Sequence, residues 1–421
     1  MDKVAALSPM GFMSRHPYKI ERLAWRDQVL AEIALPTGVL RVTLGLGSGL
    51  ARRPGDPSDR LWAIGDRGPN LKIRQAVEQY GLDHLRDLAD IDGAKIMPRP
   101  DIGPTIVELS LKDGEVSFVR ALPLHTATGR LVSGLPLPGG GEAEMEPTFD
   151  LAGKLLPADG GADTEGLVAL KDGGFWAADE YGPSLMRIDP QGVVTARWVP
   201  EGVVGNCDPP LSPILPAIAG RRRLNRGFEA LAISADEAWL YAAFQSPLEH
   251  ADQEARSRHA RIWKIDAATG AVGAQFVYPL DKPSSFARDR EAGDVRRRDL
   301  KICEAVCVGP DRLLVMERIS STAKIYLVDL SGRGAPAHHL EVETRPAIEE
   351  LEPQDMAAAG VPTLAKSLVL STDDATEIVA DLEGMVVLSD RELILVNDND
   401  FGTQGVETQF FRVTFDEPLL R

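Results

Sequence analysis

The chain has 421 residues, 44% of them hydrophobic and 26% charged, and a formal net charge of −17. These proportions are typical of a globular protein and exclude a disordered or fibrous chain. The acidic balance disfavours nucleic acid and anionic lipid as partners, and no run of 18 apolar residues predicts a membrane span. Three cysteines cannot build a disulfide framework.

The first predicted element is an extended N-terminal run at about residues 18–35, and five β-hairpins follow it along the chain. Each hairpin opens with a small or acidic residue, then Gly or Ala, then an apolar pair, and it continues after a turn into a second apolar run. A turn-prone residue lies midway through each unit, for example Asp172-Gly173 or Pro310-Asp311. The hairpins begin at Ser48, Glu165, Glu229, Glu304 and Glu383.

Third and fourth strands follow most of the hairpins, as at residues 185–198 and 261–276. Four antiparallel strands repeated around a centre form a β-propeller. We therefore predict an all-β protein, a single propeller domain over residues 1–421, with five detected blades and a sixth, degenerate blade possible. The run at 18–35 is expected to close the last blade, which ends at 410–415.

Large insertions separate the repeats, and two of them show apolar residues at helical spacing, at 71–89 and in part at 350–370. These are expected to form short helical loop insertions. The basic clusters at 221–223 and 288–298 are expected to be solvated loop faces. The insertions are predicted at about 67–104, 126–162, 200–225, 281–301 and 344–381.

The repeat places acidic residues at equivalent positions. If the first and last residues of a hairpin are cross-strand neighbours, their side chains lie about 5 Å apart, and all such pairs gather at one mouth of the central channel. Ser48 and Gln245 break the acidic pattern. The predicted pairs are Ser48/Asp66, Glu165/Glu180, Glu229/Gln245, Glu304/Glu317 and Glu383/Asp398.

Such a ring of carboxylates needs a neutralising partner, because like charges at close range raise each other's pKa. Ligands that are all oxygen favour a hard cation, Ca²⁺ first and Mg²⁺ or Mn²⁺ second. The alternative for any one acid is a hydrogen bond to a turn or an ion pair with arginine. The predicted metal ligands are Asp66, Glu165, Asp179, Glu180, Glu229, Glu304, Glu317, Glu383, Asn397 and Asp398, with Asn399 and Asp400 nearby.

Three arginines lie beside these acids in the sequence: Arg67, Arg226 and Arg318. A guanidinium binds phosphate or carboxylate through two parallel hydrogen bonds, so these are the candidate substrate ligands, with Arg67 foremost. Each arginine would otherwise simply pair with its acidic neighbour. Glu180 and Glu304 are the candidate general bases, and together with Arg67 they form the predicted catalytic set.

Six motifs stand out in the chain: Trp62-Ala-Ile-Gly-Asp-Arg-Gly-Pro-Asn70, Asp163-Thr-Glu-Gly-Leu167, Trp176-Ala-Ala-Asp-Glu-Tyr-Gly182, Asn225-Arg-Gly-Phe-Glu-Ala-Leu231, Leu382-Glu-Gly-Met385 and Asn397-Asp-Asn-Asp-Phe-Gly402. Together they resemble the family named for the esterase-like activity of phytase, from about residue 40 to the C-terminus. The resemblance implies a β-propeller, often exported in bacteria, that hydrolyses phosphate esters. The β-propeller phytases with which this family is compared use several Ca²⁺ ions.

The leading prediction is a metal-dependent hydrolase of phosphate esters that takes a small anionic substrate at the acidic mouth. Two alternatives remain: a lactone or carboxylic-ester hydrolase of the gluconolactonase type, and a non-catalytic propeller braced by an ion that binds a partner. No nucleic acid partner is expected, and the oligomeric state is open. The resemblance favours a periplasmic or secreted location, although Met1-Asp-Lys-Val-Ala-Ala-Leu lacks the pattern of a signal peptide.

Overall fold

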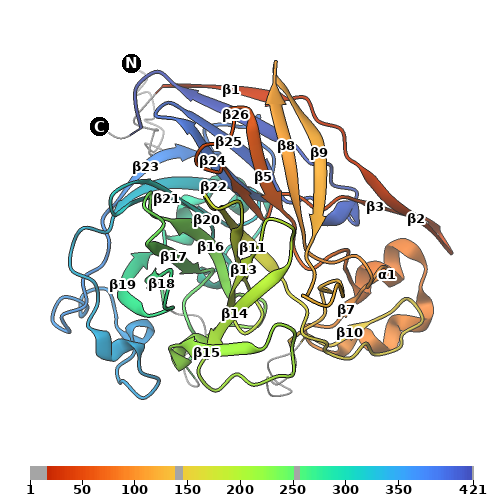
Figure 1. Cartoon of the computed structure of the whole chain (residues 1–421), viewed down its shortest axis with the longest axis horizontal. Coiled ribbons are helices and arrows are strands. Elements are labelled where there is room, and N and C mark those ends of the chain that lie inside the picture. Colours follow the sequence, from red (N-terminus) through yellow and green to blue (C-terminus); the bar gives the residue numbers. More distant parts are fainter. Residues whose placement is uncertain (1–16, 138–145, 251–256, 420–421) are drawn as a thin grey trace, which may run out of the picture.

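A computed structural model describes residues 17–137, 146–250 and 257–419 (Figure 1). Within these residues, five sheets have four or five strands each, and one strand of each sheet lies innermost. The innermost strands contact one another in cyclic order, the last meeting the first again: β4 (Gly49–Ala51), β11 (Thr164–Ala169), β16 (Phe228–Ile233), β20 (Lys301–Gly309) and β24 (Leu382–Ser389). Antiparallel sheets arranged radially around a centre are the architecture of a β-propeller, so the predicted fold is confirmed.

The strands of each sheet follow one another along the chain, apart from the last. The first sheet contains β4 (Gly49–Ala51), β5 (Arg60–Ile64), β8 (Thr105–Lys112) and β9 (Glu115–Pro123). The second contains β11 (Thr164–Ala169), β12 (Phe175–Asp179), β13 (Ser184–Ile188), β14 (Val194–Pro200) and the parallel strand β15 (Leu211–Leu215). The third contains β16 (Phe228–Ile233), β17 (Trp239–Phe244), β18 (His259–Asp266) and β19 (Val272–Pro279).

The fourth sheet contains β20 (Lys301–Gly309), β21 (Arg312–Arg318), β22 (Ala323–Asp329) and β23 (Lys366–Ser371). The fifth joins the two ends of the chain and contains β24 (Leu382–Ser389), β25 (Glu392–Asn397), β26 (Phe410–Phe415) and β1 (Tyr18–Leu23). β1 runs antiparallel to β26, as the top of Figure 1 shows. Residues 29–35 do not join this sheet, because β2 (Val29–Leu35) pairs with β3 (Gly38–Thr43).

Each pair of neighbouring sheets encloses its own hydrophobic cluster, which explains the apolar runs on the inner strands. Side chains alternate between the two faces of a strand. On β5, Trp62 therefore packs on Phe175 of the second sheet, with ring centroids 5.0 Å apart, whereas Leu61 belongs to the cluster shared with Val396 of the fifth sheet. Successive side chains on one strand thus bind the ring together on both sides.

The insertion after β5 builds a small layer beside the ring (Figure 1). It contains β6 (Leu71–Lys72), β7 (Lys95–Ile96), the helix α1 (Ile73–Tyr80) and a 3-10 segment at Asp83–Asp90, and β10 (Thr148–Phe149) from the later 126–162 insertion pairs with β7. Apolar residues of α1 at helical spacing pack against β3, and Gly81 ends the helix with a positive φ of 70°. This confirms the predicted helical insertion.

The remaining insertions hold little regular structure. The helix α2 (Ala287–Ala292) lies in the 281–301 insertion, and its basic residues are mostly exposed. In the stretch at 350–370 the predicted helix shrinks to one 3-10 turn at Ile348–Glu350 ahead of β23, because Pro353 and Pro362 interrupt it. The predicted insertion at 126–162 includes residues 138–145, which lie outside the described residues. No helix in the described part of the chain has the length and apolar character needed to cross a membrane.

Candidate metal centre

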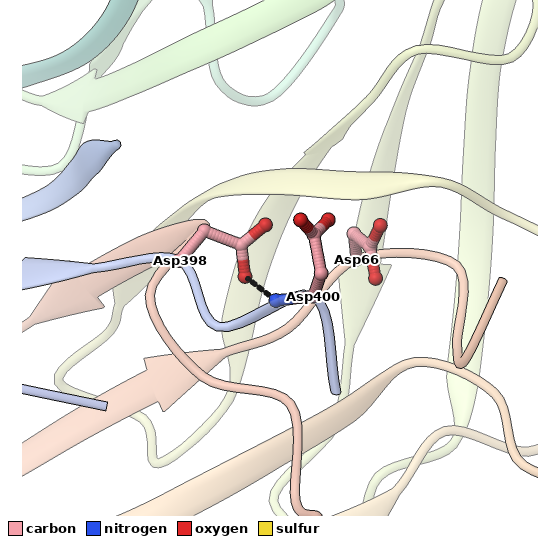
Figure 2. A group of neighbouring side chains, drawn as sticks. All are labelled: Asp66, Asp398 and Asp400. Carbon is pink, nitrogen blue, oxygen red and sulfur yellow. Dashed lines mark hydrogen bonds between the residues drawn. The ribbon is translucent and has the colours of Figure 1, made fainter. Parts of the chain in front are cut away.

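Three aspartates form the first carboxylate group at one mouth of the ring. Asp66 follows β5, while Asp398 and Asp400 follow β25, and one oxygen of each lies within 4.8 Å of the others. Figure 2 shows the three neighbouring side chains on the loops that carry them, with Asp398 directed toward Asp400. The Asp400 amide donates to Asp398 Oδ1 at 3.1 Å, which holds these two carboxylates in place.

A second carboxylate group lies deeper and contains Asp163, Glu165 and Glu180, again with oxygens within 4.8 Å of one another. All three side chains are buried, and neither oxygen of Glu180 has a hydrogen-bond partner among the described residues. Burial, reinforced by the neighbouring Glu229 carboxylate, raises the pKa of both Glu165 and Glu180. Buried carboxylate oxygens without a donor are costly, and a bound cation would satisfy them.

Arg67 holds the second group in place. Its guanidinium is buried and pairs with Glu146 and Asp163, donates to Asn225, and lies 3.9 Å from Glu180 Oε2. Both terminal nitrogens of Arg67 therefore bind protein groups. In the structure this arginine is an internal counter-ion of the carboxylates. Such pairing is the alternative to the substrate contact that the sequence predicts.

The loop of Arg67 packs tightly against Gly134, which leads to a first prediction. A Cβ at Gly134 would overlap the carbonyl oxygen of Arg67, so Gly134→Ala must displace the arginine backbone. We expect a loss of about 1–3 kcal/mol or more in the free energy of unfolding, measured by urea titration. Gly220→Ala, where a Cβ would meet nothing within 4 Å, is the matched control and should change it little. Equal losses in both variants would contradict this account.

The predicted cross-strand pairs are wrong in register. Thr164, rather than Glu165, lies opposite β12 at Asp179, and Glu317 lies opposite Ile302 rather than Glu304. The reason is a one-residue β-bulge in the innermost strands β11, β16, β20 and β24, which shifts the pairing and redirects the side chains beside it. The acids still gather in the centre, but through the bulges rather than through direct pairing.

Two predicted ligands are engaged by basic residues instead of belonging to either group. Asp179 accepts hydrogen bonds from Arg197, from Ser184 and from two backbone amides. Glu317 accepts from Lys366 Nζ at 2.6 Å and from the Tyr278 hydroxyl at 3.0 Å. The structure does not bring either residue into the carboxylate groups.

Three further predicted ligands also make structural contacts. Glu304 accepts from the backbone amides of Leu50 at 3.2 Å, Ala305 at 2.9 Å and Met385 at 3.4 Å, so its carboxylate ties three innermost strands together. Asn397 accepts from the Gln409 amide at 2.7 Å and donates to two carbonyls. The third, Glu383, pairs with Arg318.

The remaining predicted residues border the second group. Glu229 is buried; one oxygen accepts from Gln245, and the other has no hydrogen-bond partner among the described residues. Arg226 donates to the Leu300 carbonyl at 3.2 Å, whereas Arg318 pairs with Asp381 at 2.8 Å as well as with Glu383. Of the predicted ligands, Asp66, Glu165, Glu180 and Asp398 are the ones that the structure assembles into carboxylate groups.

Sequence reasoning missed Asp163 as a member of the site and left Asp400 as a neighbour. Asp163 lies two residues before Glu165, at the start of the bulge between Thr164 and Leu167, and both side chains belong to the same group. The only signal was the acidic spacing in Asp163-Thr-Glu-Gly-Leu167. Glu146, which pairs with Arg67, gave no signal because it lies in an insertion.

Chemically, the two groups offer oxygen ligands that could hold a metal ion.

Comparisons with known structures give only distant similarity. An aldose sugar dehydrogenase from Streptomyces coelicolor, in its PQQ-bound form, is 13% identical over 95% of this chain and 100% of that one, with a TM-score of 0.38. Virginiamycin B lyase from Staphylococcus aureus is 11% identical over 94% and 99%, with a TM-score of 0.32. A gluconolactonase from Xanthomonas campestris is 11% identical over 74% and 68%, with a TM-score of 0.27.

Comparisons of sequence are more informative. An uncharacterized secreted protein of Arthroderma benhamiae is 28% identical over 221 residues, which is 45% of this chain and only 40% of the fungal protein. The family described as phytase-like, with esterase-like activity of phytase, matches residues 43–401, which include both carboxylate groups. The chain belongs to this phytase-like family.

Proposed function

We propose that the protein is a metal-dependent hydrolase of phosphate esters that acts at the carboxylate groups. The observation that carries the proposal is the second group, where buried carboxylate oxygens of Glu180 lack donors beside Asp163 and Glu165. Ligands that are all oxygen favour Ca²⁺ over transition metals, with Mg²⁺ or Mn²⁺ as substitutes. The family membership supports an ester as the substrate.

The residues present fit a divalent cation in either group. Asp163, Glu165 and Glu180 would hold it in one, and the three aspartates would hold it in the other. A bound cation would polarise a phosphoryl oxygen and lower the pKa of a nearby water.

The chain's own residues supply the rest of the site. Glu180, whose raised pKa reflects its burial, is the group that can accept a proton from water. Arg67 orients Asp163 and Glu146 and so keeps the group assembled. The name of the fungal relative supports a secreted location.

Metal removal tests the proposal. We expect the protein to hydrolyse p-nitrophenyl phosphate, to lose this activity when EDTA removes the metal, and to recover it when Ca²⁺ is restored. The same assay is run on gluconolactone and p-nitrophenyl acetate. Turnover of these two but not of the phosphate would favour the lactone or carboxylic-ester alternative. A lower melting temperature in EDTA with no turnover of any substrate would indicate an ion that only braces the sheets.

A further inference from the structure

Lys301 lies at the first position of β20, directly opposite Arg318 on β21. Side chains of directly opposed residues project from the same face of a sheet, and like charges in this position are destabilising. Two cations are therefore brought together beside the innermost strands. Such a pair persists only when something else on the protein or in solution compensates the charge.

Carboxylates of the protein neutralise only one of these two cations. Arg318 pairs with Glu383 and with Asp381, so its charge is neutralised. The Lys301 ammonium has neither a hydrogen bond nor a carboxylate within 4.0 Å in the described ranges 17–137, 146–250 and 257–419. Lys301 is nevertheless only partly exposed. It is thus a half-buried cation without a partner.

Arg226 adds a second uncompensated cation. Its guanidinium donates to the carbonyl of Leu300, the residue before Lys301, and makes no ion pair with any described carboxylate. The neighbouring charge of Arg318, with burial and Arg226, lowers the pKa of Lys301 to about 8, and burial with Arg223 lowers that of Arg226 to about 10. Neighbouring positive charges thus contribute to lowering the pKa of both Lys301 and Arg226.

These cations border the second carboxylate group: the Ile302 amide, next to Lys301 in the chain, donates to the Gln245 carbonyl at 2.8 Å, and the Gln245 side chain donates to Glu229. After burial, the strongest influence on the pKa of Glu229 is the charge of Lys301, and Glu229 in turn acts on Glu180. A group of acids that needs a cation therefore adjoins basic side chains that need an anion. An anionic ligand would contact the basic side chains directly and the carboxylates only through the cation that they would hold.

We propose that Lys301 and Arg226 bind the phosphoryl group of the substrate beside the second carboxylate group. The assignment rests on the proposed phosphate-ester chemistry and adds Lys301 to it as a substrate-binding residue. A neutral lactone or carboxylic ester would leave both cations uncompensated. The site therefore selects substrates that carry a negative charge at the reacting group.

The test measures binding of inorganic phosphate to the Ca²⁺-loaded full chain by calorimetry. Lys301→Met is expected to weaken phosphate binding roughly tenfold or more, and to raise KM for p-nitrophenyl phosphate more than it lowers kcat. Lys301→Arg, which keeps the charge, should restore most of the affinity. Lys112→Met, at an exposed lysine that pairs with Asp59 in the first sheet, is the matched control and should bind phosphate as the wild type does.

Two outcomes separate this inference from the proposed function. Normal phosphate affinity in Lys301→Met, with Ca²⁺ binding intact, would overturn the role of Lys301 alone. Absence of Ca²⁺ binding in the wild type would overturn the proposed function first, and the inference with it. Should Lys301→Met fail to fold, Arg226→Met serves in its place under the same criteria.

Discussion

Glu165→Gln is expected to abolish Ca²⁺ binding at the second carboxylate group and to lower phosphate-ester hydrolysis by more than about 100-fold. Even residues behind metal ligands typically cost about 10- to 100-fold, and Glu165 would be a direct ligand. Its oxygen lies within 4.8 Å of oxygens of Asp163 and Glu180, and glutamine keeps the shape while removing the charge. Calorimetry with Ca²⁺ measures the first effect, and turnover of p-nitrophenyl phosphate measures the second.

The same variant should behave differently without metal. Because Glu165 is buried among like charges that raise its pKa, removing its charge relieves repulsion in the metal-free protein. We therefore expect Glu165→Gln to keep or raise the melting temperature in EDTA, while the increase that Ca²⁺ gives the wild type disappears. Glu108→Gln is the matched control, because Glu108 is also buried but pairs with Arg60 at 2.8 Å and Arg120 at 2.6 Å. Normal Ca²⁺ binding by Glu165→Gln would refute the proposed site.

Arg261→Met is expected to destabilise the protein by about 3–5 kcal/mol in urea titrations at neutral pH. Arg261 is fully buried and holds Glu349 with two parallel hydrogen bonds of 2.7 Å and 2.8 Å, while His250 lies 3.0 Å from the same carboxylate. The variant leaves a buried carboxylate without its main partner. The double variant Arg261→Met/Glu349→Leu removes both charges and should recover most of the loss; a double variant no more stable than the single one would contradict this reasoning.

Lowering the pH should reduce the loss of unfolding free energy that Arg261→Met causes. Burial opposes ionisation of Glu349, but Arg261 outweighs burial and holds its pKa at about 2, below the ordinary value of 4.5. A carboxyl whose pKa is lower in the folded state contributes stability above pH 4.5 and loses it as the pH falls toward 2. The difference in unfolding free energy between wild type and variant should therefore narrow over this range. A difference that stays constant down to pH 2 would contradict the assignment.

The spacing of the repeated motif predicted the general arrangement of the hairpins around a centre, but it did not predict the register of their strands. The repeated motif at Glu165, Glu229, Glu304 and Glu383 correctly indicated hairpins whose acids approach a common centre. It could not indicate the bulges, because an extra residue in a strand leaves no mark in the hydrophobic pattern of these short segments. Direct pairing of Glu304 with Glu317 was therefore the wrong expectation.

The partners of individual acids were also out of reach of sequence reasoning. Lys366, which neutralises Glu317, comes from the outer strand of the same sheet, and Arg197 reaches Asp179 from β14. Such contacts depend on the face of the folded sheet from which each side chain projects. Lys301 lies in no recognised motif, and its proposed role in binding could be inferred only from the structure, which places it opposite Arg318.

The pairing of β1 with β26 has a consequence for the order in which the protein is made. β1 is made first, but it cannot complete the fifth sheet until β26, which ends at Phe415, has left the ribosome. The entropic cost of joining such distant segments grows only slowly with their separation, about 0.6 kcal/mol for each doubling, so the distance between β1 and β26 along the chain adds little to the cost of closure. Until the two strands pair, β1 and the growing fifth sheet both present an open edge, and open strand edges are templates for pairing with other chains.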